Sequence, residues 1–224
     1  MEAGMSVLNG ASNDPRDLNS PEELELERIL VQKASEGDQR SVGALYDRYV
    51  SSLYRFCLSK TGNETDAEDL TEDIFLKAIT SLDKFTWRPK GKKTEESFSP
   101  FRAWLFRIAR NQIISMYRKR DTRSRVDVQV EEEPIWVADK SAGPAEITER
   151  KFLLEQAAAA IEELPESQRD VVRLRFFGDM SVDEVARSLG KEPGNVRVLQ
   201  HKALKNLRNI LAGEFDLLGA ESQR

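Results

Sequence analysis

The chain has 224 residues, 39% hydrophobic and 33% charged, a composition typical of a folded protein with one large domain or two small ones. Its net charge of −5 argues against a protein that coats nucleic acid through a uniformly basic surface. One cysteine and one histidine exclude an intramolecular disulfide and a zinc site of the usual Cys/His kind, which is typical of a reducing cytoplasm. Without a long apolar run or a signal-peptide pattern, we expect neither membrane insertion nor secretion.

Charged residues of opposite sign are concentrated in different segments. Residues 21–83 contain 7 basic and 14 acidic residues, and residues 126–149 contain 1 basic and 7 acidic residues. Conversely, residues 101–125 contain 8 basic and 1 acidic, and residues 185–213 contain 6 basic and 1 acidic. Two basic segments separated by an acidic stretch with proline and glycine favour two binding modules joined by a linker. Hydrophobic residues recur every three or four positions in both modules, which predicts an all-α fold.

Two helices are predicted at the start of the N-terminal module. Apolar residues from Val42 to Cys57 share one helical face, and this helix is expected to end near residues 61–63. The position of Cys57 on that face favours a buried structural residue over a reactive thiol. The next helix is expected to start at Thr65, because Thr65 and Glu68 have the spacing of a capping box. Its acidic face, which is either solvated or a docking surface for a basic partner, consists of Glu68, Asp69, Glu72 and Asp73.

A third helix is expected to start at Ser99-Pro100, an N-cap followed by proline at the first helical position. The residues predicted to face inward from it are Phe101, Trp104, Leu105 and Ile108. Another side carries Arg107, Arg110, Asn111 and Arg118, and the preceding loop carries Phe85, Trp87 and Phe98. Basic and aromatic side chains together can neutralise phosphates and stack on unpaired bases. Trp104 is more typical of a core, whereas the Pro/Gly/Lys-rich loop around Trp87 gives no indication of burial.

The C-terminal module is predicted to contain helices over residues 152–164, 166–177, 182–189 and 193–212. Ser181 and Glu184 form a second capping box, and Gly190 is a typical residue just beyond a helix end. A short helix, a tight turn and a long basic helix are the pattern of a helix-turn-helix. The outward stripe of the long helix consists of Arg197, His201, Lys205 and Arg208, with Lys202 beside it. This stripe fits the major groove of DNA, although a solvated basic helix would show the same pattern.

Three segments carry a family resemblance: DAEDLTEDIFLKAI (Asp66–Ile79), FRAWLFRIARNQIISMYRKR (Phe101–Arg120) and ELPESQRDVVRLRFFGDMSVDEVARSLG (Glu163–Gly190). In their order and spacing they resemble the sigma factors of bacterial RNA polymerase, in the extracytoplasmic-function (ECF) group. The resemblance covers about residues 25–213. It implies a region 2 domain over 22–120 and a region 4 helix-turn-helix domain over 148–213, with a flexible acidic linker over 121–147 between them. Residues 1–21 and 214–224 lie outside the match, and there we expect a disordered extension and a tail.

The resemblance also implies a role for each charged surface. Binding of core RNA polymerase is implied for Glu68, Asp69, Glu72, Asp73 and Phe75. Binding of the minus-ten promoter element is implied for Trp87, Phe98, Arg107, Arg110, Asn111, Arg118, Lys119 and Arg120. Binding of the minus-thirty-five element is implied for Arg197, Val198, His201, Lys202 and Lys205. The sequence departs from the family in the turn Lys191-Glu192, where Ile-Ser is common, and in an insertion over 88–96.

The resemblance implies an initiation factor, expected in the cytoplasm, that binds core RNA polymerase and promoter DNA and helps to melt the promoter. The resemblance implies an anti-sigma factor as a further partner. No enzymatic activity and no cofactor are expected, because the sequence lacks a Walker-type loop, an H-E-x-x-H motif and a G-x-S-x-G motif. The alternative is a helix-turn-helix regulator that binds duplex DNA without polymerase. A protein that only binds other proteins would not depend on the basic stripe at Arg197.

Overall fold

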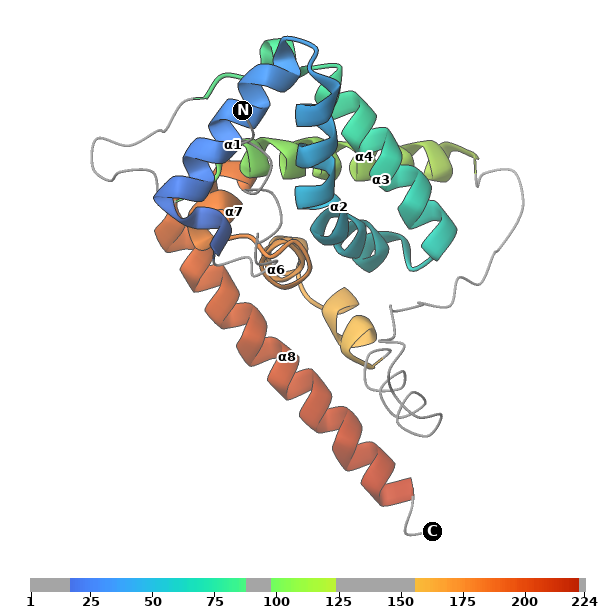
Figure 1. Cartoon of the computed structure of the whole chain (residues 1–224). Coiled ribbons are helices and arrows are strands. Elements are labelled where there is room, and N and C mark those ends of the chain that lie inside the picture. The colour runs from blue at the N-terminus through green and yellow to red at the C-terminus, as the bar shows by residue number, and fades with distance from the viewer. Residues whose placement is uncertain (1–16, 88–97, 124–155, 222–224) are drawn as a thin grey trace, which may run out of the picture.

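The structure is a computed structural model that describes residues 17–87, 98–123 and 156–221, and all regular elements in these ranges are helices (Figure 1). This confirms the all-α prediction. We call the described residues up to 123 the N-terminal unit and those from 156 the C-terminal unit. Most of the predicted extension, most of the linker and the whole 88–96 insertion lie outside the described residues.

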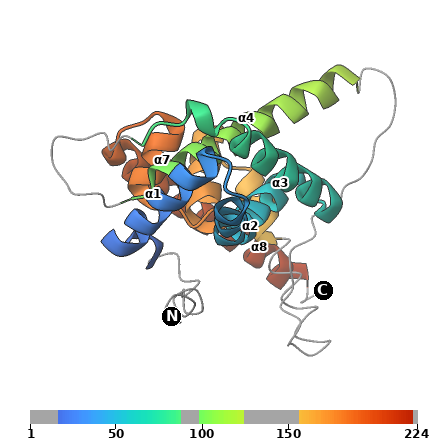
Figure 2. The same ribbon diagram turned by 45° about the horizontal axis from the view of Figure 1, so that its top comes forward.

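The N-terminal unit contains the helices α1 (Pro21–Ser35), α2 (Gln39–Thr61), α3 (Glu64–Ile79) and α4 (Pro100–Arg123). Two short 3-10 turns accompany them: η1 (Asp17–Asn19) and η2 (Leu82–Lys84). Helix α2 packs against α1, α3 and α4, so it is the centre of the unit. Figure 2 shows the C-terminal end of α4 extending beyond the neighbouring helices.

Local side chains set the ends of these helices. The Arg102 backbone N–H donates to Ser99 Oγ at 2.8 Å, which confirms the predicted start of α4. Helix α2 ends at Gly62, where a left-handed φ of 67° suits glycine. The capping box predicted at Thr65 is wrong: the Asp66 backbone N–H donates to Asn63 Oδ1 at 3.0 Å, and α3 starts at Glu64. Asparagine is at least as good an N-cap as threonine, and Asn63 directly follows the turn.

The C-terminal unit contains a helix over 156–162, followed by α6 (Glu166–Val172), the π-helical turn η3 (Arg173–Phe177), α7 (Val182–Leu189) and α8 (Pro193–Glu221). Both hydrogen bonds of the predicted capping box at Ser181 are present, and Gly190 ends α7 with a φ of 65°. Helix α8 continues beyond its predicted end near 212, and it extends away from the other helices (Figure 1).

One hydrophobic core joins the two units. Phe56 of α2 and Phe106 of α4 have ring centroids 5.4 Å apart, and their cluster includes Leu174, Met180 and Val185 of the C-terminal unit. Fully burying one such side chain contributes about 1.5–3 kcal/mol. A second cluster, within the C-terminal unit, consists of Ile161, Leu164, Val172 and Ala203. The sequence predicts two modules joined by a linker, and the structure packs them directly against each other.

Candidate nucleic-acid interface

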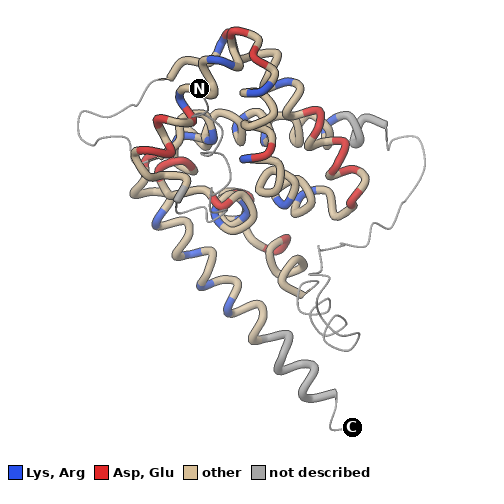
Figure 3. Tube along the Cα trace, in the orientation of Figure 1, with Lys and Arg blue, Asp and Glu red and all other residues tan. Residues whose placement is uncertain are grey.

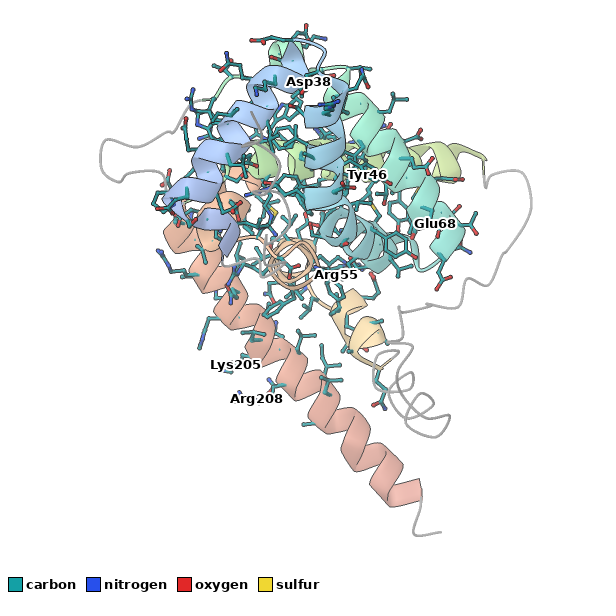
Figure 4. The ribbon with its side chains drawn as sticks, viewed as in Figure 1. Asp38, Tyr46, Arg55, Glu68, Lys205 and Arg208 are labelled. Carbon is teal, nitrogen blue, oxygen red and sulfur yellow. The ribbon has the colours of Figure 1, made fainter. Side chains whose placement is uncertain are left out.

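The acidic face of α3 is exposed as predicted. Its exposed members are Glu68, Asp69, Glu72 and Asp73. Acidic positions recur along α3 in Figure 3, and Figure 4 labels Glu68 on this helix. Phe75 does not share this face: it is only 4% exposed and packs against Tyr46 with ring centroids 4.9 Å apart. Sequence reasoning missed two exposed apolar neighbours, Tyr46 at 38% and Leu76 at 65%. The surface of α3 is therefore acidic with an apolar margin.

The basic face of α8 is exposed along one side of the helix. Its members are Arg197, Val198, His201, Lys202 and Lys205. Val196 and Ala203, on the other side of the helix, are fully buried. Basic positions recur along α8 in Figure 3, and Lys205 and Arg208 project from it in Figure 4. In the turn before α8, the Lys191 backbone N–H donates to Ala186 O at 2.8 Å, which closes the C-terminal end of α7 just before the basic helix begins.

The basic residues of α4 face the C-terminal unit more than the sequence suggested. Arg110 Nε donates to Asp170 Oδ2 at 2.9 Å, and Arg107 donates to the backbone carbonyl of Arg187. Asn111 and Arg118 are exposed on the same helix. The side chains of Lys119 and Arg120 lie outside the described residues. The structure therefore divides the predicted minus-ten set between the surface and the junction of the two units.

The aromatic residues before α4 are half-buried. Trp87 packs edge-to-face on Phe85, with ring centroids 6.1 Å apart. The Arg187 guanidinium lies over the Phe98 ring at 5.8 Å from its centroid. Phe98, Arg107 and Arg187 also line a cleft of about 440 Å³ between α4 and the start of α8. Trp104 is half-buried against the core, as the sequence favoured.

A buried polar network at the junction was not foreseen. Glu184 Oε1 accepts from the Ser99 backbone N–H at 3.2 Å, and Glu184 Oε2 accepts from the Ser181 backbone N–H at 2.6 Å. One carboxylate thus joins the N-cap residues of α4 and α7. Arg102, 1% exposed, donates to Gly178 O at 2.7 Å and lies 3.9 Å from Glu184. The Ser181 contact belongs to the predicted capping box. No sequence motif indicates the contacts between Glu184 and Ser99, Arg102 and Gly178, or Arg102 and Glu184, because their partners are about eighty residues apart.

The same network includes a buried carboxyl group from α1. Glu27 accepts hydrogen bonds from the Tyr49 hydroxyl and from Ser99 Oγ, the latter at 2.7 Å. Burial raises the pKa of Glu27 to about 7, although these hydrogen bonds and the charge of Arg48 oppose the shift. Burial also raises the pKa of Tyr49. Glu27 therefore lies next to the contact between the units and titrates near neutral pH.

Family comparisons match both units. The model for sigma-70 region 2 matches residues 45–123, and the model for sigma-70 region 4 matches residues 160–209. CnrH, an RNA polymerase sigma factor of Cupriavidus metallidurans, is 31% identical over 76% of this chain and 85% of its own length. The chain is an RNA polymerase sigma factor of the ECF group. The ECF sigma factor BldN of Streptomyces coelicolor is also 31% identical, over 81% of this chain and 64% of its own length.

The solved structures include a related sigma factor with a second protein. One solved structure is that of CnrH in complex with the cytosolic domain of CnrY. Its match to the present structure spans 84% of this chain and 97% of the matched chain, with 28% sequence identity and a TM-score of 0.57. In the present protein, helix α4 belongs to the segment that matches sigma-70 region 2, and helices α6 and α7 belong to the segment that matches region 4. The polar network described above therefore connects region 2 to region 4.

Two further observations limit the chemistry of the described ranges. Among their helices, none combines the length and the apolarity that crossing a bilayer requires. The described residues also contain no group of three or more His, Cys, Asp or Glu side chains placed to hold a metal ion. Cys57 is buried, and burial raises the pKa of its thiol to about 12, so this thiol is a packing group rather than a nucleophile.

Proposed function

We propose that this sigma factor binds core RNA polymerase through the acidic face of α3 and binds the minus-thirty-five promoter element through α8. One observation carries the proposal: α8 exposes Arg197 and Lys202 while Val196 and Ala203 on its opposite side are buried. A basic helix presented in this way fits the major groove, which admits a single α-helix. Its lysines are placed to neutralise phosphates, and Arg197 to contact base edges.

We assign the minus-ten element to α4 and to the aromatic residues before it. Asn111 and Arg118 are exposed on α4, and Trp87 and Phe98 are half-buried. Stacking of a base on an aromatic ring contributes about 1–3 kcal/mol, so two such rings can help to hold unpaired DNA. Such a protein acts as an initiation factor in the cytoplasm and performs no covalent chemistry itself.

The domain limits and a protein partner belong to the same proposal. We propose a region 2 domain over residues 22–120 and a region 4 domain over 148–213, joined by residues 121–147. Because CnrH has been solved with CnrY, we also propose that a protein partner, an anti-sigma factor, binds this chain. Such a partner would have to cover surfaces in both units to block both promoter elements.

Transcription in vitro tests this function. Adding the protein to core polymerase that lacks sigma should allow transcription from a cognate promoter. Asp73→Arg should weaken binding to core polymerase about tenfold or more, because it places a like charge against a basic partner. Glu36→Arg makes the same charge change at an exposed position at the end of α1 and should have little effect. Tight duplex binding without transcription, or equal effects of the two variants, would refute the assignment.

A further inference from the structure

Asp170 of region 4 joins two cations of region 2. Its Oδ1 accepts from Lys60 Nζ at 2.9 Å and its Oδ2 accepts from Arg110 Nε at 2.9 Å. The side chains of Asp170, Lys60 and Arg110 are 8%, 13% and 31% exposed. Lys60 lies near the end of α2 and Arg110 lies in α4, so two helices of one region converge on one carboxylate of the other.

The pKa values of Asp170 and Lys60 depend on the ion pair that these two residues form. Burial raises the pKa of Asp170, but the charges and hydrogen bonds of Lys60 and Arg110 outweigh burial and hold that pKa below its usual value. Burial and the nearby Arg173 lower the pKa of Lys60, whereas Asp170 opposes that shift. Removing the carboxylate would therefore leave Lys60 and Arg110 without their shared acceptor, with Glu166 4.0 Å from Arg110 and the charge of Glu162 acting on Lys60. Two partly buried cations without their acceptor favour an anionic ligand.

A phosphodiester group has the chemistry that this site requires. It carries one negative charge and two non-bridging oxygens, as a carboxylate carries one charge and two oxygens. Lysine and arginine are the usual side chains that contact DNA phosphates. Lys60 was not among the predicted DNA contacts, whereas Arg110 was. The two side chains are already oriented toward one small anion.

We propose that Lys60 and Arg110 form a binding site for one phosphate of promoter DNA, and that Asp170 occupies this site while regions 2 and 4 are packed together. The proposal rests on the function proposed above. Asp170 lies in α6, so it leaves the site when region 4 moves away from region 2. Binding of DNA at this site and packing of the two regions are therefore mutually exclusive.

Other contacts at the junction favour the same competition. Arg107, a second predicted DNA contact, donates to a backbone carbonyl of region 4. Arg55 of α2 forms an ion pair with Asp179 of region 4 (Figure 4 labels Arg55). Region 4 thus supplies acceptors to Arg55, Arg107 and Arg110 of region 2. A DNA strand that reaches these side chains would replace those acceptors with phosphates.

The first test compares two carboxylates of α6. Asp170→Asn removes the charge at the site, whereas Glu166→Gln makes the same change at an 81% exposed residue whose carboxylate is 4.0 Å from Arg110. The probe is a labelled single-stranded DNA of mixed sequence, and binding by the full chain is followed by fluorescence anisotropy. We expect Asp170→Asn to tighten binding about tenfold and Glu166→Gln to change it less than about twofold. Equal affinities for the two variants would overturn the proposal.

A second variant tests the phosphate site itself. Lys60→Gln, combined with Asp170→Asn, should return the affinity for the same DNA to about the wild-type value. A thermal melt of each variant shows whether it is folded. If Asp170→Asn does not fold, Lys60→Gln alone remains a test: it should lower DNA affinity about threefold or more at low salt. An unchanged affinity in that variant would also overturn the phosphate site.

A third measurement separates the packing of the regions from DNA binding. Spin labels on cysteines introduced at Leu76 and Lys205, both exposed, report the distance between regions 2 and 4 without DNA or polymerase. Because Cys57 is buried, it should react little with the label. Asp170→Asn should lengthen or broaden this distance, and Glu166→Gln should not. Tighter DNA binding without any change in distance would overturn the competition, whereas failure of wild-type transcription would instead refute the proposed function.

Discussion

The buried Glu27 makes stability depend on pH in a way that can be isolated by one substitution. Its pKa is about 7 in the folded protein and about 4.5 in the unfolded chain. Below pH 4.5 both states bind the proton, and the contribution of Glu27 to stability is fully present. Between pH 4.5 and 7 the unfolded chain releases the proton while the folded protein keeps it. Stability is therefore lost as pH rises through this window, by about 3 kcal/mol in total.

Glu27→Gln keeps the size of the side chain and removes its titration. The amide oxygen can still accept from Tyr49 and Ser99, and the amide nitrogen would replace Glu27 Oε2, which has no hydrogen-bond partner among the described residues. Near this position lie the charges of Arg48 and Glu184. The new N–H donors beside Arg48 can lower stability at every pH. The prediction concerns how the free energy of unfolding changes with pH, and a pH-independent loss of stability in the variant does not affect it.

Urea unfolding at several pH values measures that slope. The free energy of unfolding of Glu27→Gln relative to the wild type should increase by about 3 kcal/mol between pH 4.5 and pH 7.5. Other titrating groups cancel in this difference because they are common to both proteins. Glu22→Gln, at an exposed position in the first turn of α1, is the control and should follow the wild type. Parallel curves for Glu27→Gln and the wild type would refute the reasoning.

Two further substitutions test the junction between the regions. In Gly178→Ala the new Cβ would lie 2.8 Å from Phe106 Cε1, so we expect a loss of about 1–3 kcal/mol in urea unfolding. Phe106→Leu in the same chain should recover part of that loss, and an unchanged stability would contradict the close packing. Glu184→Ala removes the acceptor shared by the two N-caps and should cost about 2 kcal/mol, measured by thermal unfolding. Asp183→Ala, in the same turn, should cost less than half as much; equal losses would contradict a role for the shared contact.

Local features of this fold could be predicted from the sequence, since they depend on neighbouring residues. The capping box at Ser181, the left-handed Gly190 and the N-cap Ser99 all occur where the pattern indicates them. The cap of α3 was misplaced because Asn63 and Thr65 are both good N-caps, and only the geometry of the preceding turn decides between them. The resemblance implies polymerase binding for Phe75 together with the acidic residues, whereas in the structure Phe75 is buried against Tyr46.

The junction could not be predicted, because it depends on pairs far apart in the chain. The residues around Arg110 in the sequence are the same whether its side chain contacts DNA or Asp170. The pattern of basic and aromatic residues indicates DNA as its partner and gives no sign of Asp170. Asp170 looks like an ordinary acidic residue of an amphipathic helix, and the sequence indicates only the local capping role of Glu184. Only the packing of α4 against α7 gives Glu184 its second hydrogen-bonding partner, Ser99. Residues with two alternative partners of similar chemistry are the ones that a single sequence leaves undetermined.

The junction combines two kinds of contact with different consequences. The apolar packing of Phe106 and Leu174 stabilises the packed state of regions 2 and 4, and it involves no charged group that an anion could replace. The pairs made by Asp170 add little net stability, because burial costs these ions their hydration, but they fix which groups face each other. A DNA phosphate can meet the same cations in similar geometry, whereas it cannot replace the apolar contacts. Opening of the two regions therefore requires an additional source of free energy, and contacts of α3 and α8 with their own partners are suited to supply it.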